Sequence, residues 1–369
     1  MTAVAVYVHI PFCPSKCGYC DFNSYAMTGE IVERTARAIA QEIRQSPWRG
    51  RPAKTIFFGG GTPTYLSESQ LIPIIEAVLE THPPTADCEF TSEANPGTVD
   101  MPKFAAMRRA GVNRISLGAQ SFARQDLIRL GRVHQAPEIV RAVGVAREAG
   151  FDEINLDLMF GLPGQSMAGW ERNLEIALSL GPTHLSLYGL TIEPNTRYYK
   201  LHLRGMLDLP TEDVHVAMYD RAMDAAEAAG LQQYEISNFA RPGSQCQHNL
   251  AYWRGEEYLG YGPGAVGCFQ EDGRRHRYTV LKHPERYCQA IEQGTGLWFD
   301  EEWLDEDDLR LEELMLGLRL NEGLSPTIAL AERGLKKVLD RGWVEQMDNR
   351  LRLTRSGRHF CSEVAAELA

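Results

Sequence analysis

Three cysteines near the amino end have the residue type and spacing to bind a metal centre. Cys13, Cys17 and Cys20 form a C-x3-C-x2-C pattern. Three thiolates can hold three irons of a [4Fe-4S] cube and leave the fourth iron open for an external ligand. Zinc and unrelated cysteines are the alternatives, but a structural zinc site normally has four ligands, and the next cysteine, Cys88, lies far along the chain. The spacing therefore favours an iron–sulfur cluster.

A glycine run follows the second predicted strand. Gly60 and Gly61, followed by Thr62, would let the backbone approach a ligand closely, although a tight turn alone would also explain them. Polar residues also follow other strands: Glu93, Gln120 and Asp157 end the third, fourth and fifth. The carboxyl ends of parallel strands share one face, so we expect these side chains to converge there rather than to act only as helix caps or ion pairs.

Each of these polar groups suits a different kind of ligand group. Carboxylates accept hydrogen bonds from ribose hydroxyls. The planar fork of Arg132 suits a ligand carboxylate, and a surface ion pair is the alternative interpretation of this arginine. The set predicts a polar ligand site beside the cysteines.

The elements that must position these residues alternate between short β-rich runs and amphipathic helical patterns. This alternation predicts an α/β fold of parallel βα units. Six units are too few for an eight-unit barrel, so we expect a partial (β/α)6 TIM-like barrel, with a doubly wound sheet as the alternative. The predicted strands are 3–10, 55–58, 88–93, 114–119, 154–159 and 184–188, and the predicted helices are 30–45, 68–80, 101–110, 137–149 and 170–180.

The alternation stops after residue 188. A loop is expected over 191–210, a helix over 212–229 and short strands over 232–282. Farther on, helical patterns and a hairpin around Asp348 and Asn349 follow in an order typical of a winged helix. The predicted domains are a core at 1–240, a connecting segment at 241–284 and a smaller α+β, winged-helix-like domain at 285–369.

Composition excludes several classes of protein. The chain has 369 residues, of which 44% are hydrophobic and 24% charged, and its net charge is −11. Such a composition is typical of globular proteins and argues against disorder. The acidic balance argues against a nucleic-acid partner. Because no apolar run approaches the ~20 residues that span a bilayer and no secretory signal is visible, we expect a cytoplasmic protein.

The motifs together resemble the radical S-adenosylmethionine (SAM) superfamily. In that superfamily the three cysteines bind a [4Fe-4S] cluster, and the amino and carboxylate groups of SAM chelate its open iron. One electron from the cluster then cleaves SAM to methionine and a 5′-deoxyadenosyl radical. The resemblance is closest to the oxygen-independent coproporphyrinogen III oxidase-like family, through Tyr7, the cysteines, GGGTPTYL (59–66), SEANPGT (92–98), RISLGAQSF (114–122), LGRVH (130–134) and DLMFGLPGQ (157–165).

In that family two SAM molecules can occupy the site. By position, the resemblance implies contacts to the first SAM from Tyr7, Gly60 and Glu93. It implies contacts to the second from Tyr19, Gly61, Thr62, Gln120, Arg132 and Asp157. One or two SAM molecules are therefore expected.

Two features separate the chain from the true oxidases. Those enzymes carry a fourth cysteine two positions after the third, where this chain has Phe22. They also have a long N-terminal extension, whereas the first predicted strand here begins close to residue 1. Both differences weaken the expectation of oxidative decarboxylation, and the sequence leaves enzymatic activity open.

A further motif, H-N-x-x-Y-W, resembles the signature of the haem chaperones of this family. The resemblance implies haem contacts: His248 would supply an imidazole ligand, and Tyr252 and Trp253 would supply flat apolar faces. Cys246, just before the motif, is a second candidate ligand. The structural alternative is that Tyr252 and Trp253 pack in the core while His248 bonds to the backbone.

The sequence thus predicts a haem chaperone with a SAM-ligated [4Fe-4S] cluster that delivers haem to apo-haemoproteins, including those of the respiratory chain. A small donor such as a flavodoxin or ferredoxin would supply electrons, and a homodimer and a monomer both remain open. One alternative is an oxygen-independent coproporphyrinogen III dehydrogenase or another two-SAM radical enzyme. The other is a zinc-binding structural protein.

Overall fold

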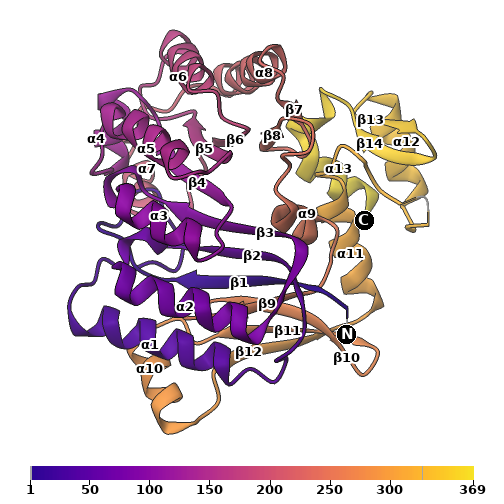
Figure 1. Cartoon of the computed structure of the whole chain (residues 1–369). Helices are drawn as coiled ribbons and strands as arrows, with labels where there is room; N and C mark the ends of the chain where they lie inside the picture. The colour runs from indigo at the N-terminus through magenta and orange to yellow at the C-terminus, as the bar shows by residue number, and fades with distance from the viewer. Residues whose placement is uncertain (1, 326) are drawn as a thin grey trace.

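A single curved sheet organises the molecule (Figure 1). The computed structural model describes residues 2–325 and 327–369. Within them the large sheet has twelve strands in the order β12-β11-β10-β9-β1-β2-β3-β4-β5-β6-β8-β7. Its centre is formed by six parallel strands, β1 (Val4–Ile10), β2 (Ala53–Gly60), β3 (Pro84–Ala94), β4 (Arg114–Gln120), β5 (Glu153–Phe160) and β6 (His184–Gly189).

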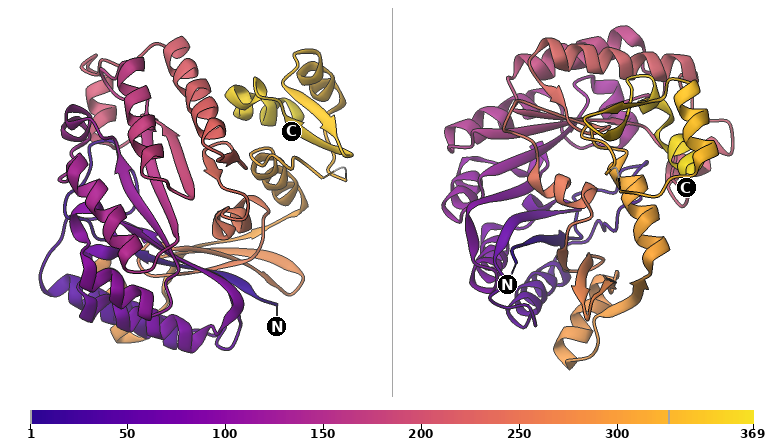
Figure 2. Two further views of the ribbon diagram at one scale, coloured as in Figure 1. Left: turned by 45° about the horizontal axis from the view of Figure 1, so that its top comes forward. Right: turned by 90° about the vertical axis from the view of Figure 1, so that its right-hand side faces the viewer.

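Helices follow these strands and cover the outer side of the sheet, as the left view of Figure 2 shows. Caps define several of their ends: Ser67 and Gln70 form a capping box on α2, and the Asp100 side chain accepts from the Lys103 N–H at the start of α3. The helices are α1 (Glu30–Arg44), α2 (Glu68–Thr81), α3 (Met101–Arg109), α4 (Arg124–Leu130), α5 (Ala136–Glu148) and α6 (Met167–Ser179), with short 3-10 turns at Pro63–Tyr65 and Pro96–Thr98.

The two faces of the parallel strands differ in chemistry. Ile115 and Leu117 of β4 are fully buried in the core formed with the helices. Arg114 and Ser116, which alternate with them, line a cavity on the inner face. Parallel strands covered on both faces usually read as continuous apolar runs. A polar inner face therefore marks the inside of the partial barrel as a place for a ligand.

Later segments extend the sheet at both edges. On one side β6 pairs antiparallel with β8 (Asn238–Ala240), which pairs with β7 (Gln232–Gln233). On the other, β9 (Tyr258–Tyr261) pairs parallel with β1, and β10 (Val266–Glu271), β11 (Arg274–Val280) and β12 (Trp298–Leu304) continue antiparallel. The connecting helices are α7 (Arg197–His202), α8 (Glu212–Ala228), α9 (Gln247–Trp253) and α10 (Pro284–Gln293).

The C-terminal residues form a smaller unit with its own apolar core, drawn in orange to yellow in Figure 1. It contains α11 (Glu306–Gly317), α12 (Glu332–Asp340), β13 (Val344–Met347), β14 (Arg350–Leu353), a 3-10 turn (Gly357–Phe360) and α13 (Cys361–Leu368). The expected hairpin is present. Its turn residues Asp348 and Asn349 both have positive φ, 49° and 62°, as a two-residue type I′ turn requires.

The predicted partial barrel is confirmed, and its helices lie on the outer side rather than on both faces as in a doubly wound sheet. Three details differ from the expectation. Helix α4 was not predicted, 191–210 contains α7 instead of being loop throughout, and α9 forms where short strands were expected. Packing also places the start of the C-terminal unit near 305 rather than 285, because β12 pairs with β11 in the large sheet. In the described residues, no helix has the length and apolarity to cross a membrane.

Candidate functional site

The loop that carries the three cysteines follows β1 and is tied down at its base and its tip. At the base, the Tyr25 N–H donates to the Pro11 carbonyl at 2.7 Å. At the tip, the Gly18 N–H donates to Leu130 at 3.2 Å, and the Gly18 carbonyl accepts from Tyr198 at 2.9 Å. A Cβ on Gly18 would lie 3.0 Å from the Tyr198 ring, so a larger residue there would make this ring shift. The loop is thereby fixed at the carboxyl ends of the strands.

All three thiols line one cavity of about 120 Å³. The Cys13 Sγ lies 3.6 Å from the Thr62 hydroxyl, and the Arg132 Nη1 lies 3.7 Å from the Cys17 Sγ. Burial raises the pKa of both Cys13 and Cys20 above that of a free thiol. Within residues 2–325 and 327–369, no three His, Cys, Asp or Glu side chains are arranged to hold a single metal ion.

The same cavity gathers most of the residues predicted to contact SAM. It is lined by Tyr19, Gly60, Gly61, Thr62, Glu93, Gln120, Arg132 and Asp157, which come from the cysteine loop and from the ends of four strands or the segments that follow them. Gly61 has no space for a side chain, because a Cβ there would lie 2.6 Å from the Phe12 carbonyl oxygen. The structure therefore brings these eight residues together around one cavity.

Tyr7 is the exception among the predicted SAM contacts. It does not appear in the lining of the cysteine cavity or of the larger cavity beside it. Its hydroxyl is hydrogen-bonded to the His9 Nδ1 at 3.0 Å, and the other ring nitrogen of His9 is bonded to the Asn23 carbonyl at 2.8 Å. In this structure Tyr7 is therefore connected to the cysteine loop by hydrogen bonds through His9.

The two carboxyl groups of the site, Glu93 and Asp157, belong to half-buried residues that line the cavity. Burial raises the pKa of Glu93 to about 8, the nearby Asp157 adds to the rise, and the Gly60 N–H, 3.1 Å from Glu93 Oε2, opposes it. Burial also raises the pKa of Asp157, although Asn155 and Ser116 donate to it at 2.7 and 3.2 Å. At neutral pH Glu93 is mainly protonated and can donate as well as accept a hydrogen bond.

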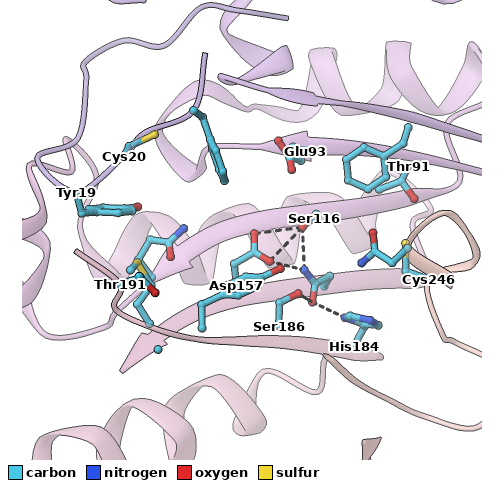
Figure 3. A pocket seen from close by; sticks show the side chains of 18 of the residues that line it. Tyr19, Cys20, Thr91, Glu93, Ser116, Asp157, His184, Ser186, Thr191 and Cys246 are labelled. Carbon is cyan, nitrogen blue, oxygen red and sulfur yellow. Dashed lines mark hydrogen bonds between the residues drawn. The ribbon is translucent and has the colours of Figure 1, made fainter. Parts of the chain in front are cut away.

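A larger cavity of about 380 Å³ adjoins the cysteine cavity (Figure 3). The two cavities share seven lining residues, so a ligand in one contacts the wall of the other: Tyr19, Cys20, Phe22, Glu93, Ser116, Gln120 and Asp157. Sequence reasoning missed the remaining polar wall of the larger cavity. That wall includes Thr91, Arg114, Ser116, Asn155, His184, Ser186 and Asn249.

A signal for this polar wall was present in the sequence. The strands read Arg-Ile-Ser from 114, Asn-Leu-Asp from 155 and His-Leu-Ser from 184, so a polar residue recurs at every second position. Side chains two apart on a strand share a face. The register confirms the alignment, since Ser116 pairs with Asn155 and Asn155 pairs with His184.

The H-N-x-x-Y-W motif forms α9, where most of its side chains are already engaged. His248 is 1% exposed, its Nδ1 is bonded to the Thr55 hydroxyl at 2.8 Å, and its Nε2 is bonded to the Tyr252 hydroxyl at 3.1 Å. Burial lowers the pKa of His248 to about 3. Trp253 lies outside the large cavity and contacts the Arg319 guanidinium, 4.4 Å from its ring centre.

Cys246 is the one predicted haem contact that faces the large cavity. Its Sγ also lies 3.4 Å from Glu89 Oε1, and burial raises the pKa of this thiol. Of the predicted haem contacts, Cys246 therefore lines the large cavity. The other three, His248, Tyr252 and Trp253, do not line it.

The donor set at the cysteine loop fits a [4Fe-4S] cluster with a nucleoside ligand. The three thiols line a cavity whose far walls carry two carboxyl groups. The Nε of Arg132 is buried and has no hydrogen-bond partner among the described residues, so it can bind an acceptor from a ligand. These are the soft donors and the polar contacts that a cluster and its external ligand need.

Comparisons with known proteins agree with this geometry. Residues 7–177 match the radical SAM superfamily, and residues 304–360 match the HemN C-terminal domain. The haem chaperone HemW of Bacillus subtilis is 38% identical over 98% of this chain and 97% of its own length. HemW of Escherichia coli is 44% identical over 78% of this chain and 76% of its own length.

A solved structure agrees with the fold as a whole. The coproporphyrinogen III oxidase HemN of Escherichia coli, described as a radical SAM enzyme, superposes with a TM-score of 0.83 over 99% of this chain and 89% of its own, at 23% identity. At that identity the likeness shows the shared fold. The matches over nearly the whole length support more: this chain belongs to the radical SAM superfamily and, within it, to the HemW family, whose membership implies a [4Fe-4S] cluster and SAM.

Proposed function

We propose that this chain is a haem chaperone, which binds haem beside a SAM-ligated [4Fe-4S] cluster and delivers the haem to apo-haemoproteins, including those of the respiratory chain. The observation that carries the proposal is the 38% identity to the Bacillus subtilis haem chaperone over 98% of this chain. Phe22, at the position of the oxidases' fourth cysteine, points the same way. A small flavodoxin or ferredoxin would supply electrons.

In this proposal the residues of the cysteine cavity hold the cofactors. Cys13, Cys17 and Cys20 bind the cluster, which with SAM supplies one-electron chemistry when bound. Glu93, mainly protonated at neutral pH because burial raises its pKa to about 8, donates a hydrogen bond to a ligand oxygen. Arg132, whose Nε has no partner in the described chain, binds a ligand carboxylate.

Haem is proposed to enter the larger cavity. Cys246 is the candidate iron ligand on its wall. Ligation by His248 would first require one of its hydrogen bonds, to Thr55 or to Tyr252, to break. Phe22, with 65% of its surface exposed, also borders this cavity and offers an aromatic face to a macrocycle.

The direct test is haem binding and transfer by one anaerobically reconstituted sample. Haem is titrated into the protein, followed by absorption, and the loaded protein is mixed with an apo-cytochrome. We expect saturable binding and appearance of holo-cytochrome faster than from free haem. Cys246→Ser should weaken binding, and Cys361→Ser, in the C-terminal unit, is the matched control. Absence of saturable haem binding would refute the proposal.

A second candidate function is radical catalysis on a porphyrinogen. It is favoured by the polar cavity of about 380 Å³ that adjoins the thiols, which is large enough for a second SAM or part of a substrate. The test is anaerobic incubation with coproporphyrinogen III, SAM and a reductant. We expect no protoporphyrinogen, and product together with 5′-deoxyadenosine would establish the enzyme instead.

Family membership favours an iron–sulfur cluster over a zinc ion at the three cysteines.

A further inference from the structure

Two buried polar groups at one end of the large cavity have no partner in the described chain. They are the Thr91 Oγ1 and the Arg114 Nη2, on side chains that are 1% and 3% exposed. The two residues are direct neighbours, because Thr91 of β3 pairs with Arg114 of β4 in parallel register. Both line the cavity. Buried polar atoms are almost always hydrogen-bonded, so two unsatisfied atoms on neighbouring side chains that line one cavity indicate a missing acceptor.

This end of the cavity lies away from the cysteine loop. Thr91 and Cys246 stand on the opposite side of the cavity from Tyr19 and Cys20 in Figure 3. Arg114 is the first residue of β4, whereas Gln120, the last, lines the cysteine cavity. A ligand that reached both ends would have to be elongated along the strands.

The arginine is held in place by its other nitrogen. The Arg114 Nη1 donates to Glu153 Oε2 at 3.1 Å, which leaves Nη2 fixed and free to donate. Glu153 is also bonded by the Thr183 and Ser244 hydroxyls, each at 2.9 Å. Its charge is therefore already compensated by several donors, and it does not remove the donor capacity of Arg114.

The other carboxyl groups near this end are also compensated. Glu89 accepts from the backbone N–H groups of Gln247 and His248, at 2.9 and 3.0 Å, and from the Cys246 thiol. Glu93, two residues along β3 from Thr91, is mainly protonated at neutral pH, because burial raises its pKa to about 8. An incoming anion therefore meets one guanidinium N–H and one hydroxyl, beside carboxylates whose oxygens already accept hydrogen bonds from the chain.

We propose that Arg114 and Thr91 form a carboxylate-binding subsite at the end of the large cavity remote from the cysteines. A carboxylate has two oxygens that can accept from donors on adjacent strands, which are about 4.8 Å apart. The subsite rests on the proposed function for its ligand: haem carries propionate carboxylates on one edge and an apolar macrocycle elsewhere. One propionate binds Arg114 and Thr91, and the macrocycle extends toward Phe22 and the cysteine loop.

The test compares haem with its dimethyl ester, which lacks the charged carboxylates. Dissociation constants are measured by absorption titration for the reconstituted wild type, Arg114→Gln and Thr91→Val. The wild type should bind haem about tenfold to a hundredfold more tightly than the ester, the range expected for a charge-assisted hydrogen bond. Arg114→Gln should bind both ligands equally weakly, and Thr91→Val should lose part of the preference.

Two control variants separate this effect from general damage. Thr81→Val also removes a buried hydroxyl that has no partner in the described residues, but Thr81 ends α2 and lines neither cavity. Arg108→Gln removes an arginine of α3 that lies outside the large cavity. Both should keep the full preference for haem over its ester. An equal preference in wild type and Arg114→Gln would overturn the subsite.

A third ligand distinguishes failure of the subsite from failure of the proposed function. Succinate, a small free dicarboxylate, is titrated against the same proteins and followed by the melting temperature. Stabilisation by succinate that is lost in Arg114→Gln, without haem binding to the wild type, would keep the carboxylate subsite and refute the haem chaperone. If neither succinate nor haem binds, the subsite is refuted as well, and buried water alone satisfies the two groups.

Discussion

The cysteine loop and helix α9 carry equally distinct sequence motifs, but the structure uses them in opposite ways. In the loop, the thiols of Cys13, Cys17 and Cys20 line a cavity, and other groups hold the loop in place, such as the backbone of Gly18 and the side chain of Asn23. In α9, side chains hold the helix in place: the His248 ring is hydrogen-bonded to the hydroxyls of Thr55 and Tyr252. The loop presents its thiols to a cavity, whereas in α9 both ring nitrogens of His248 and the hydroxyl of Tyr252 are hydrogen-bonded within the protein.

The difference shows what a motif needs before it can bind a ligand. A side chain can bind an external group only if its polar atom is not already satisfied by the protein. Both ring nitrogens of His248 have partners inside the protein, whereas Cys246, two residues earlier, lines the ligand cavity and its thiol has one long contact, to Glu89 at 3.4 Å. Sequence alone gives residue type and spacing, which are the same in both situations. We therefore expect substitutions in the two regions to change different properties.

The largest expected effect comes from Cys17→Ala. Removing one of three cluster ligands should reduce bound iron and sulfide to near background, because the remaining two thiols cannot hold the cube. The free energy of unfolding of the apo-protein should change by less than about 1 kcal/mol, since the half-buried thiol has one weak contact, to Arg132. Iron and sulfide analysis after anaerobic reconstitution, with urea unfolding, measures both.

Cys361→Ala is the matched control for this variant, because Cys361 is also half-buried but lies in α13 of the C-terminal unit. It should retain the full cluster. A full cluster in Cys17→Ala would show that this thiol is not a ligand.

The second-largest effect is expected for His248→Ala, which should lower stability and leave the cluster content unchanged. Loss of His248 leaves the Thr55 and Tyr252 hydroxyls without their shared partner and opens a small void. The free energy of unfolding should fall by about 3 kcal/mol, while iron and sulfide content stay at the wild-type level. Urea unfolding of the apo-protein and metal analysis test the two parts. Unchanged stability with a large loss of haem affinity would instead make His248 a haem contact.

The pH dependence of stability provides a smaller effect. His248 has a pKa of about 3 in the folded chain, against about 6.5 when unfolded, so the unfolded state binds the proton first as pH falls. Stability should therefore be lost below pH 6.5, by about 2 kcal/mol from this residue between pH 6.5 and 5. The difference in the free energy of unfolding between wild type and His248→Ala should shrink by that amount, as measured by urea unfolding at pH 7, 6 and 5.

Other buried groups make the comparison between variants necessary. His9 and His134, each with a pKa lowered by burial to about 4, act in the same direction as His248. Glu42, with a pKa raised by burial to about 7, acts in the opposite direction, because stability is lost as pH rises through 7. These contributions are equal in both proteins and cancel. A constant difference between wild type and variant across pH 5–7 would contradict a buried neutral His248.

Much of the core could be predicted because its signals are local. The six parallel strands and the type I′ turn at Asp348 and Asn349 follow from residue patterns a few positions long. The pairing of β9 with β1 could not be predicted, because it joins residues more than half the chain apart. The site divides in the same way: spacing identified the cysteines, but whether His248 faces a ligand or Thr55 depends on long-range packing.

The smallest expected change in stability, and the last test of the comparison, comes from Phe22→Ser. Phe22 lies in the cysteine loop and is 65% exposed, so the free energy of unfolding of the Phe22→Ser protein should differ from wild type by less than about 0.5 kcal/mol. Because Phe22 borders both cavities, haem should nevertheless bind about threefold to tenfold more weakly when this aromatic face is removed. Absorption titration with haem measures the change, and Phe360→Ser, at a half-exposed aromatic of the C-terminal unit, is the control. Unaltered haem affinity in Phe22→Ser would mean that the macrocycle does not reach the mouth of the cavity, and the loop would then present its thiols alone.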